Sequence, residues 1–217
     1  MGAHKADHAD TPPQIQQEKR FDPLHFVAPT EFVDLPSQGK GYPAGHPLHG
    51  KDTIEIRYMT AKDEDILSSQ TLLKKGLALE RILQNIIINQ SVDATKLFVA
   101  DRNAILIAAR ISGYGNQYQT HITCPACGAQ SDCNFDLNEK KVVYLNLNSE
   151  LGIEETGTGT FTTTMPYSKF KVEFKLLLGE DEIYISKMSS TKRKKKMIES
   201  MLSDQYKRMI VGIEGHK

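Results

Sequence analysis

The hydrophobic pattern of this 217-residue chain changes its spacing near Gly115. Between about residues 60 and 113, apolar side chains recur every three or four residues, which is the spacing of amphipathic helices. From residue 117 onward, apolar and polar residues alternate over short runs, which is typical of half-buried strands. The pattern therefore predicts an α+β fold, in which a helical block lies next to a small mixed or antiparallel β region and a C-terminal helix follows.

The same change of pattern divides the chain into segments. We expect an extended N-terminal arm over 1–29, a strand plus helical block over 30–116, a β region over 117–178 and C-terminal helices over 179–217. The arm is polar and contains several prolines.

Within the arm, the isolated Phe21 and Phe26 are candidate anchors on a neighbouring protein, since unstructured termini often bind in this way. A tail without an anchor fits the same residues.

Two short strands are expected before the first helix. An apolar run covers 32–35, and after a loop rich in glycine and proline, apolar and polar residues alternate over 54–58. Thr60 and Asp63 then form a capping-box pattern, which predicts the start of a short helix. The acidic run 63–65 falls in the first turn of that helix, where the helix dipole favours negative charge.

Two longer helices are expected next. Leu and Ile at helical spacing predict one helix that ends near residue 89, and Asp101 and Gly113 are the expected cap and stop of the second. The residues expected on the buried faces are Leu79, Ile82, Leu83, Ile86, Ile87, Ile105, Ala108, Ala109 and Ile111.

The β region is expected to contain a hairpin over 118–137 with cysteines at its tip. Further strands are expected over 142–147 and 170–174. The threonine- and glycine-rich run 152–166 predicts a weakly structured connection. Its glycines lack the lysine and the strand-loop-helix setting of a phosphate loop.

The charge balance restricts the function. The chain has 27 Lys+Arg and 27 Asp+Glu, so its formal net charge is zero with neutral histidines. Proteins that coat DNA or an anionic membrane rely on a sustained basic field, which this chain lacks, although a local patch stays open. The composition, 39% hydrophobic, is that of an ordinary globular protein, and no run reaches the roughly 18 apolar residues of a membrane span. We expect a soluble protein.

Three cysteines lie close together, an odd number that does not suit a disulfide framework. We therefore expect a protein made in a reducing cytoplasm. A redox Cys-x-x-Cys motif would begin a helix after a strand, whereas this one lies between two strands, so thioredoxin-like chemistry is not expected.

The run Cys124-Pro-Ala-Cys127-Gly is a knuckle in which two thiolates can hold one zinc ion. Structural zinc takes four ligands, and Cys133 and His121 are the candidates for the other two. Three alternatives stay open: a site completed by another subunit, an iron–sulfur cluster shared between copies, and a knuckle without a metal.

A second candidate site is a basic run in the C-terminal segment, where a short helix is expected over 180–188 and a longer one over 191–212. The run consists of Lys192, Arg193, Lys194, Lys195 and Lys196. At the start of the longer helix these cations would oppose the helix dipole. A solvated helix end, an acidic protein partner and nucleic acid are the three readings. One face of the longer helix would carry Met197, Ile198, Met201, Leu202, Met209 and Ile210.

The sequence contains no nucleophile elbow, His-Glu metal helix or glycine-rich phosphate loop, so we expect no enzyme.

The order of several segments resembles a known family. The segments are FVDLPSQGKGYP, IEIRYMTAKDEDIL, the Ile-rich helix, ISGYGNQYQTHITCPACG and MPYSKFKVEFKLLLGEDE, within about residues 30–185. Together they resemble the baseplate hub assembly proteins of contractile-tailed, T-even-like bacteriophages. The knuckle of that family maps only onto Cys124 and Cys127.

The resemblance implies a non-enzymatic structural or assembly component of the central hub, or of its junction with wedge, tape-measure or tube proteins. It implies that the partners are other tail proteins, with several copies in a symmetric assembly, and that the protein is assembled in the host cytoplasm and located in the virion baseplate. The alternative function is a zinc-knuckle nucleic-acid-binding or adaptor protein, although nucleic acid is not the expected partner. The acidic run 63–65 and the basic run are expected to meet opposite charges on neighbouring molecules.

Overall fold

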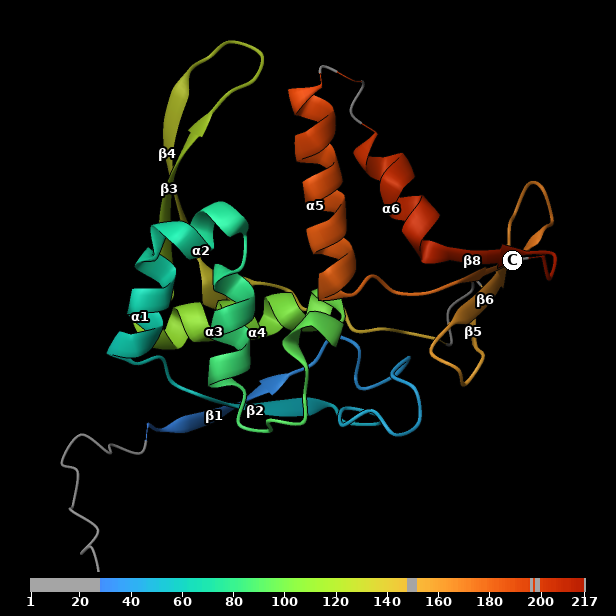
Figure 1. Cartoon of the computed structure of the whole chain (residues 1–217), viewed down its shortest axis with the longest axis horizontal. Coiled ribbons are helices and arrows are strands. Elements are labelled where there is room, and N and C mark those ends of the chain that lie inside the picture. The colour runs from blue at the N-terminus through green and yellow to red at the C-terminus, as the bar shows by residue number, and fades with distance from the viewer. Residues whose placement is uncertain (1–27, 148–151, 196, 198–199, 217) are drawn as a thin grey trace, which may run out of the picture.

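The computed structural model describes residues 28–147, 152–195, 197 and 200–216. It has the expected α+β fold, with helices and three antiparallel sheets, ordered β1-β2, β3-β4 and β5-β6-β7-β8 (Figure 1). The elements are β1 (Thr30–Asp34), β2 (Thr53–Arg57), α1 (Ala61–Ser68), α2 (Gln70–Lys75), α3 (Ala78–Ile86), the 3-10 turn η1 (Ala94–Lys96), α4 (Val99–Tyr114), β3 (Gln117–Thr123), β4 (Gln130–Asp136), the 3-10 turn η2 (Leu137–Glu139), β5 (Glu154–Glu155), β6 (Phe161–Thr164), β7 (Lys171–Phe174), α5 (Gly179–Lys194), α6 (Met201–Met209) and β8 (Ile210–Ile213).

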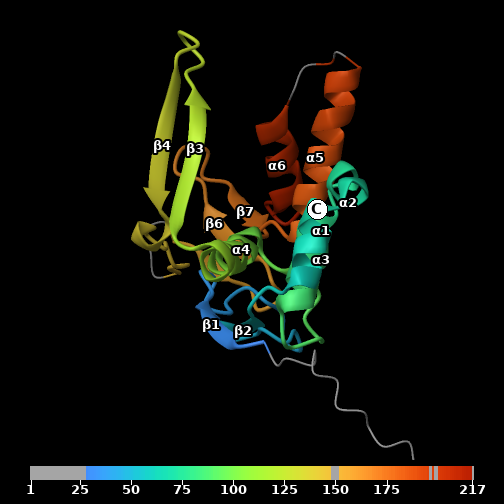
Figure 2. The ribbon, with the colours of Figure 1, turned by 90° about the vertical axis from the view of Figure 1, so that its left-hand side faces the viewer.

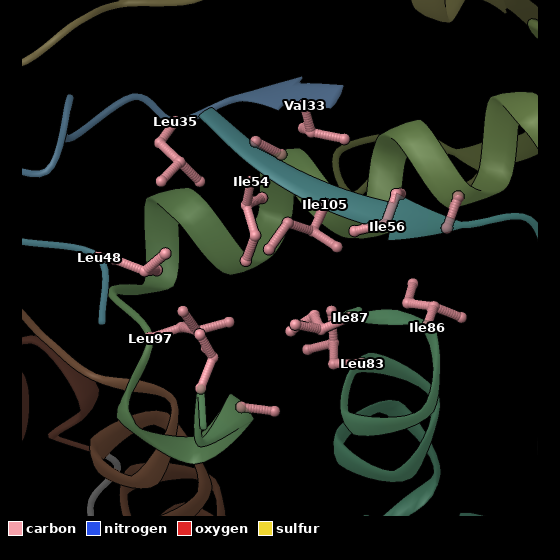
Figure 3. Packing of buried hydrophobic residues seen from close by; sticks show 14 of the residues in the cluster. Val33, Leu35, Leu48, Ile54, Ile56, Leu83, Ile86, Ile87, Leu97 and Ile105 are labelled. Carbon is pink, nitrogen blue, oxygen red and sulfur yellow. The ribbon is translucent and has the colours of Figure 1, made fainter. Parts of the chain in front are cut away.

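The hydrophobic core lies where the β1-β2 pair packs against α3 and α4 (Figure 3). Val33 pairs with Ile54 across the two strands, and both side chains are buried. Alternation turns Phe32 to the other face, where it is 71% exposed. The apolar stripe of α3 is buried as expected, except that Leu79 lies outside it and is exposed.

The expectation that Asp101 caps the second long helix is wrong. The helix α4 starts at Val99, so Asp101 lies inside its first turn. There its buried carboxylate accepts hydrogen bonds from the Ser37 amide (2.9 Å), the Ser37 hydroxyl (2.6 Å) and the Tyr42 hydroxyl (2.8 Å). These bonds hold the loop after β1 on the start of α4, a long-range contact that a local cap pattern does not reveal.

The expectation that Gly113 stops the same helix is also wrong, because α4 continues to Tyr114. The residue that ends the helix is Gly115, which has φ of +82° and whose amide donates to the carbonyl of Ile111.

The capping box of α1 is confirmed. The carboxylate of Asp63 accepts from the Thr60 amide (2.8 Å) and hydroxyl (2.9 Å), and it also pairs with the Arg57 guanidinium (2.7 Å). Asp63 is fully buried. The expectation that the whole acidic run 63–65 meets an opposite charge on a neighbouring molecule is therefore wrong for Asp63, because its carboxylate does not reach the surface.

Two expectations for the β region are wrong. Residues 142–147 form no strand; the segment follows the surface, with the amide of Leu145 bonded to the carbonyl of Pro36. The threonine- and glycine-rich run is instead structured, because β5 and β6 lie within it and pair as a hairpin. Its Thr160 hydroxyl donates to Glu173 of β7 (2.7 Å), which helps to fix the hairpin on the sheet.

The expected long helix over 191–212 is wrong as well. The helix α5 begins at Gly179, where Asp181 accepts the Leu178 amide in its first turn, and it ends at Lys194. The chain then turns back into α6, and β8 joins the sheet beside β7. Of the residues expected together on one face of that helix, Met197, Met201 and Leu202 are exposed, and Ile198 lies outside the described residues.

Two parts of the molecule extend away from the core in the same direction. The β3-β4 hairpin and α5 rise together in Figure 1, and Figure 2 places them on opposite sides of the molecule.

Candidate interaction surfaces

The β3-β4 hairpin is fixed to the body at the end of α4. The guanidinium of Arg110 donates to the carbonyls of Gly115 (2.8 Å) and Gln117 (3.2 Å). It also lies over the rings of Tyr114 (5.0 Å to the centroid) and Tyr118 (6.0 Å). These contacts hold the base of the hairpin and set the direction in which it extends.

Asn116 fixes the base by two further bonds. Its side-chain amide donates to the Asp136 carboxylate at 2.8 Å, and its backbone carbonyl accepts from the Leu137 backbone amide at 2.9 Å. Both ends of the hairpin are therefore fixed, while the rest of it contacts little of the chain: most residues of β3 and β4 are exposed and none is buried.

The two faces of the hairpin differ in chemistry. Partners across the ladder share a face, so Tyr118–Phe135, Thr120–Cys133 and Ile122–Ser131 line one side, and Gln119–Asn134 and His121–Asp132 line the other. The large apolar side chains Tyr118, Ile122 and Phe135 of the first face are each 44–48% exposed. A two-stranded hairpin is at best marginally stable alone in water, so an uncovered apolar face favours a binding partner.

The hairpin tip carries the knuckle. The amide of Cys124 donates to the carbonyl of Ala129 and the amide of Gly128 to the carbonyl of Cys124, both at 2.9 Å. Gly128 has φ of +72°, which favours glycine. The amides of Cys127 and Ala126 and the Cys127 thiol hydrogen-bond to the Cys124 sulfur and lower the pKa of the Cys124 thiol.

The structure does not bring the four expected zinc ligands together. Cys133 pairs with Thr120, three ladder positions below the last pair of the hairpin, or about 10 Å along the strand. His121 lies on the opposite face, where its ring contacts Asp132. Among the residues that the structure describes, no three His, Cys, Asp or Glu side chains gather as a metal site. The residues present therefore fit a two-thiolate half-site, not a complete one.

The second projection is the α5–α6 pair. Exposed large apolar side chains occur along it: Tyr184, Met197, Met201, Leu202 and Tyr206. The sequence did not indicate this surface, because Met197, Met201 and Leu202 were expected together on one face of a single long helix and Tyr184 and Tyr206 were not singled out.

The basic run lies at the C-terminal end of α5, not at a helix start, so the helix dipole favours these cations. Lys192 is tied down within the chain, since its ammonium group pairs with Asp204 and bonds to the Ser200 hydroxyl. The Asp204 carboxylate accepts from Lys192 and from the Ser200 hydroxyl, and these two bonds lower the pKa of Asp204. Lys194 and Lys195 are exposed, as is Arg193, whereas Lys196 lies outside the described residues, as do Phe21 and Phe26 of the arm.

The helices of the described residues are too short or too polar to cross a membrane. Comparison with curated proteins and with solved structures finds no significant match to the chain. A family model described as T4 bacteriophage base plate protein matches residues 28–210, which include the core, the hairpin and the α5–α6 pair. The match covers most of the 217 residues, and the chain therefore belongs to the T4 bacteriophage base plate protein family.

Proposed function

We propose that this chain is a non-enzymatic assembly component of the baseplate hub, acting through protein–protein interfaces with neighbouring tail proteins. Membership of the family makes it a structural component of the phage baseplate, with other tail proteins as its partners. The hub position rests on the resemblance of its segments to hub assembly proteins.

The observation that carries the proposal is the uncovered apolar face of the β3-β4 hairpin. Tyr118, Ile122 and Phe135 line this face, lie outside the hydrophobic core and are each 44–48% exposed. An isolated amphipathic hairpin of this kind gains stability when a partner covers its apolar face. The hairpin base is fixed by Arg110, so the face is presented in one orientation.

The charges of the hairpin do not favour nucleic acid as the partner. Residues 117–136 contain two aspartates and no lysine or arginine, so the knuckle offers no cation to a phosphate backbone. The basic run is at the C-terminal end of α5, which lies on the opposite side of the molecule from the hairpin (Figure 2). Its Lys192 is already paired with Asp204. A zinc-knuckle nucleic-acid binder would place its cations beside the knuckle.

The test is complementation in cells infected by a phage that lacks its own functional copy of the gene. The double variant Ile122→Ser, Phe135→Ser removes two apolar side chains of this face without touching the core or the Arg110 contacts at the hairpin base. We expect a large loss of plaques and of complete baseplates, and loss of cross-links to hub proteins. The purified variant is expected to keep its far-ultraviolet circular dichroism.

The matched control is Tyr167→Ser, which removes an aromatic ring that is 97% exposed on another turn. Full complementation by the double variant would contradict the proposal, as would cross-links to wedge proteins alone. Binding of the purified chain to DNA at low salt, with a steep loss on adding salt, would support the nucleic-acid alternative instead.

A further inference from the structure

Among the residues that the structure describes, the hairpin tip shares its backbone geometry with a second turn. In the turn after β3, the Cys124 amide donates to Ala129 and the Gly128 amide donates to Cys124. In the turn between β6 and β7, the Met165 amide donates to Phe170 (2.9 Å) and the Lys169 amide donates to Met165 (3.0 Å). Lys169, with φ of +61°, occupies the position of Gly128.

The second turn shows that this backbone shape needs no cysteine. Met165 and Ser168 stand where the first turn has Cys124 and Cys127. The thiols at the hairpin tip are therefore not required by the fold of the turn. The second turn also lacks thiols that could complete a metal site, and its sheet lies away from the hairpin tip in both views (Figures 1 and 2).

The tip itself is suited to hold a metal but has only half of the ligands. Cys124 is half-buried and Cys127 exposed, and both are free thiols. The Cys127 thiol hydrogen-bonds to the Cys124 sulfur, so the two sulfur atoms lie next to each other. Cys133 lies below the tip and His121 on the opposite face, so neither completes the site.

We propose that two copies of this chain share one zinc ion at their hairpin tips, with Cys124 and Cys127 of each copy as the four ligands. Tetrahedral zinc with four thiolates is a common structural site. Two identical half-sites meet naturally about a two-fold axis, because the same patch then serves both partners. On binding, each S–H bond is replaced by a Zn–S bond and the thiol protons pass to solvent.

The position of the tip supports a second copy as the occupant. The tip is the end of the hairpin that lies farthest from the core, on the opposite side of the molecule from α5, which leaves it accessible to the hairpin of a second molecule (Figures 1 and 2). The ligand count is also matched: each copy supplies two of the four thiolates that the zinc requires.

The test uses the full chain, kept reduced with a phosphine, and zinc alone as the added metal. We expect elemental analysis to give one zinc per two chains, and sedimentation to show a doubling of mass that a chelator reverses. Cobalt in place of zinc is expected to give the absorption bands of a tetrathiolate site. Cys124→Ser and Cys127→Ser should each abolish zinc binding and the zinc-dependent dimer.

Cys133→Ser is the matched control, because this thiol lies on the same hairpin but away from the tip, and it should leave both readouts unchanged. Binding of one zinc per chain, loss of zinc in Cys133→Ser, absence of zinc binding, or a dimer that persists in chelator would each overturn the proposal. The result is independent of the hub assignment, which rests on complementation and cross-links.

Discussion

Asp63 shows how single residues of this chain combine a local and a tertiary role. Burial alone would raise the pKa of its carboxyl group, but hydrogen bonds from Arg57 and from the Thr60 amide and hydroxyl outweigh it and lower the pKa. The same carboxylate thus starts α1 and binds α1 to the end of β2. The capping-box pattern predicted the first role, while the second depends on how β2 leads into the helix.

We predict that Asp63→Asn lowers the free energy of unfolding by about 2 kcal/mol at pH 7, since it removes the charge-assisted bonds to Arg57. The folded-state pKa of Asp63 lies below the unfolded value of about 3.9, so its stabilisation is complete above that value. The stabilisation is lost as the pH falls through the folded pKa. Urea unfolding of both proteins should therefore give a difference in the free energy of unfolding that narrows as the pH falls below about 4.

The control for this prediction is Asp65→Asn, which changes an exposed acid in the same helix. It should alter stability by no more than about 0.5 kcal/mol. A difference between wild type and Asp63→Asn that stays constant down to pH 2 would show that the carboxylate charge contributes nothing.

Among the elements, those with strictly local signals were predictable. The β1-β2 pair, α1, α3 and the β3-β4 hairpin follow from alternation, helical spacing and a cap, and the structure confirms them. The sequence-based predictions were wrong where a contact between residues far apart in the sequence determines the local structure. The bonds from Ser37 and Tyr42 to Asp101 are one example.

The bridge from Lys192 to Asp204 is another distant contact, since it joins α5 to α6 across a turn that the sequence did not indicate. The alternation of apolar and polar residues predicted the strands of the hairpin. It did not indicate that both faces of the hairpin would remain uncovered. Likewise, residue spacing suggested four metal ligands, whereas the ladder register separates Cys133 and His121 onto opposite faces.

We predict that Arg110→Ala loosens the hairpin without unfolding the body. The change removes two hydrogen bonds to the base of the hairpin and the ring contacts with Tyr114 and Tyr118. Exposed contacts of this kind contribute about 1 kcal/mol in total. Hydrogen exchange should accelerate severalfold for the amides of residues 117–136, with the core amides of α3 and α4 unchanged.

Arg81→Ala, at an exposed position of α3, is the matched control and should leave exchange in the hairpin as it is in the wild type. Equal protection of the hairpin in the Arg110 and Arg81 variants would mean that the base is held by Asn116 and Asp136 alone.

At the scale of the whole molecule, part of the charge balance is used inside the chain. Buried or half-buried acids are paired with basic residues from other elements: Asp63 with Arg57, Asp181 with Lys175 and Arg208, Asp204 with Lys192, and Glu80 and Glu182 with Arg102. Part of the neutral total therefore reflects charges that pair within the chain. The two projections carry exposed apolar side chains in addition to exposed charges.

Arg102 is the residue that joins distant parts of the chain most directly. Its buried guanidinium, on α4, contacts Glu80 of α3 and Glu182 of α5. The pairing is incomplete, because one oxygen of Glu80 and the Nε of Arg102 are buried without hydrogen-bond partners. Removing one partner of a buried ion pair strongly lowers the free energy of unfolding, because the other charge is left buried and unpaired. Replacing both partners with apolar residues of similar volume lowers it little.

We therefore predict that Arg102→Met lowers the free energy of unfolding by about 3–5 kcal/mol, since it leaves the Glu80 carboxylate buried without its cation. The double variant Arg102→Met, Glu80→Leu should recover most of that loss, because no unpaired charge remains. Urea unfolding followed by circular dichroism measures both, with Arg81→Met on the exposed side of α3 as control. If the double variant is no more stable than Arg102→Met, the attachment of α5 to the helical block depends on the charges themselves and not on the packing around them.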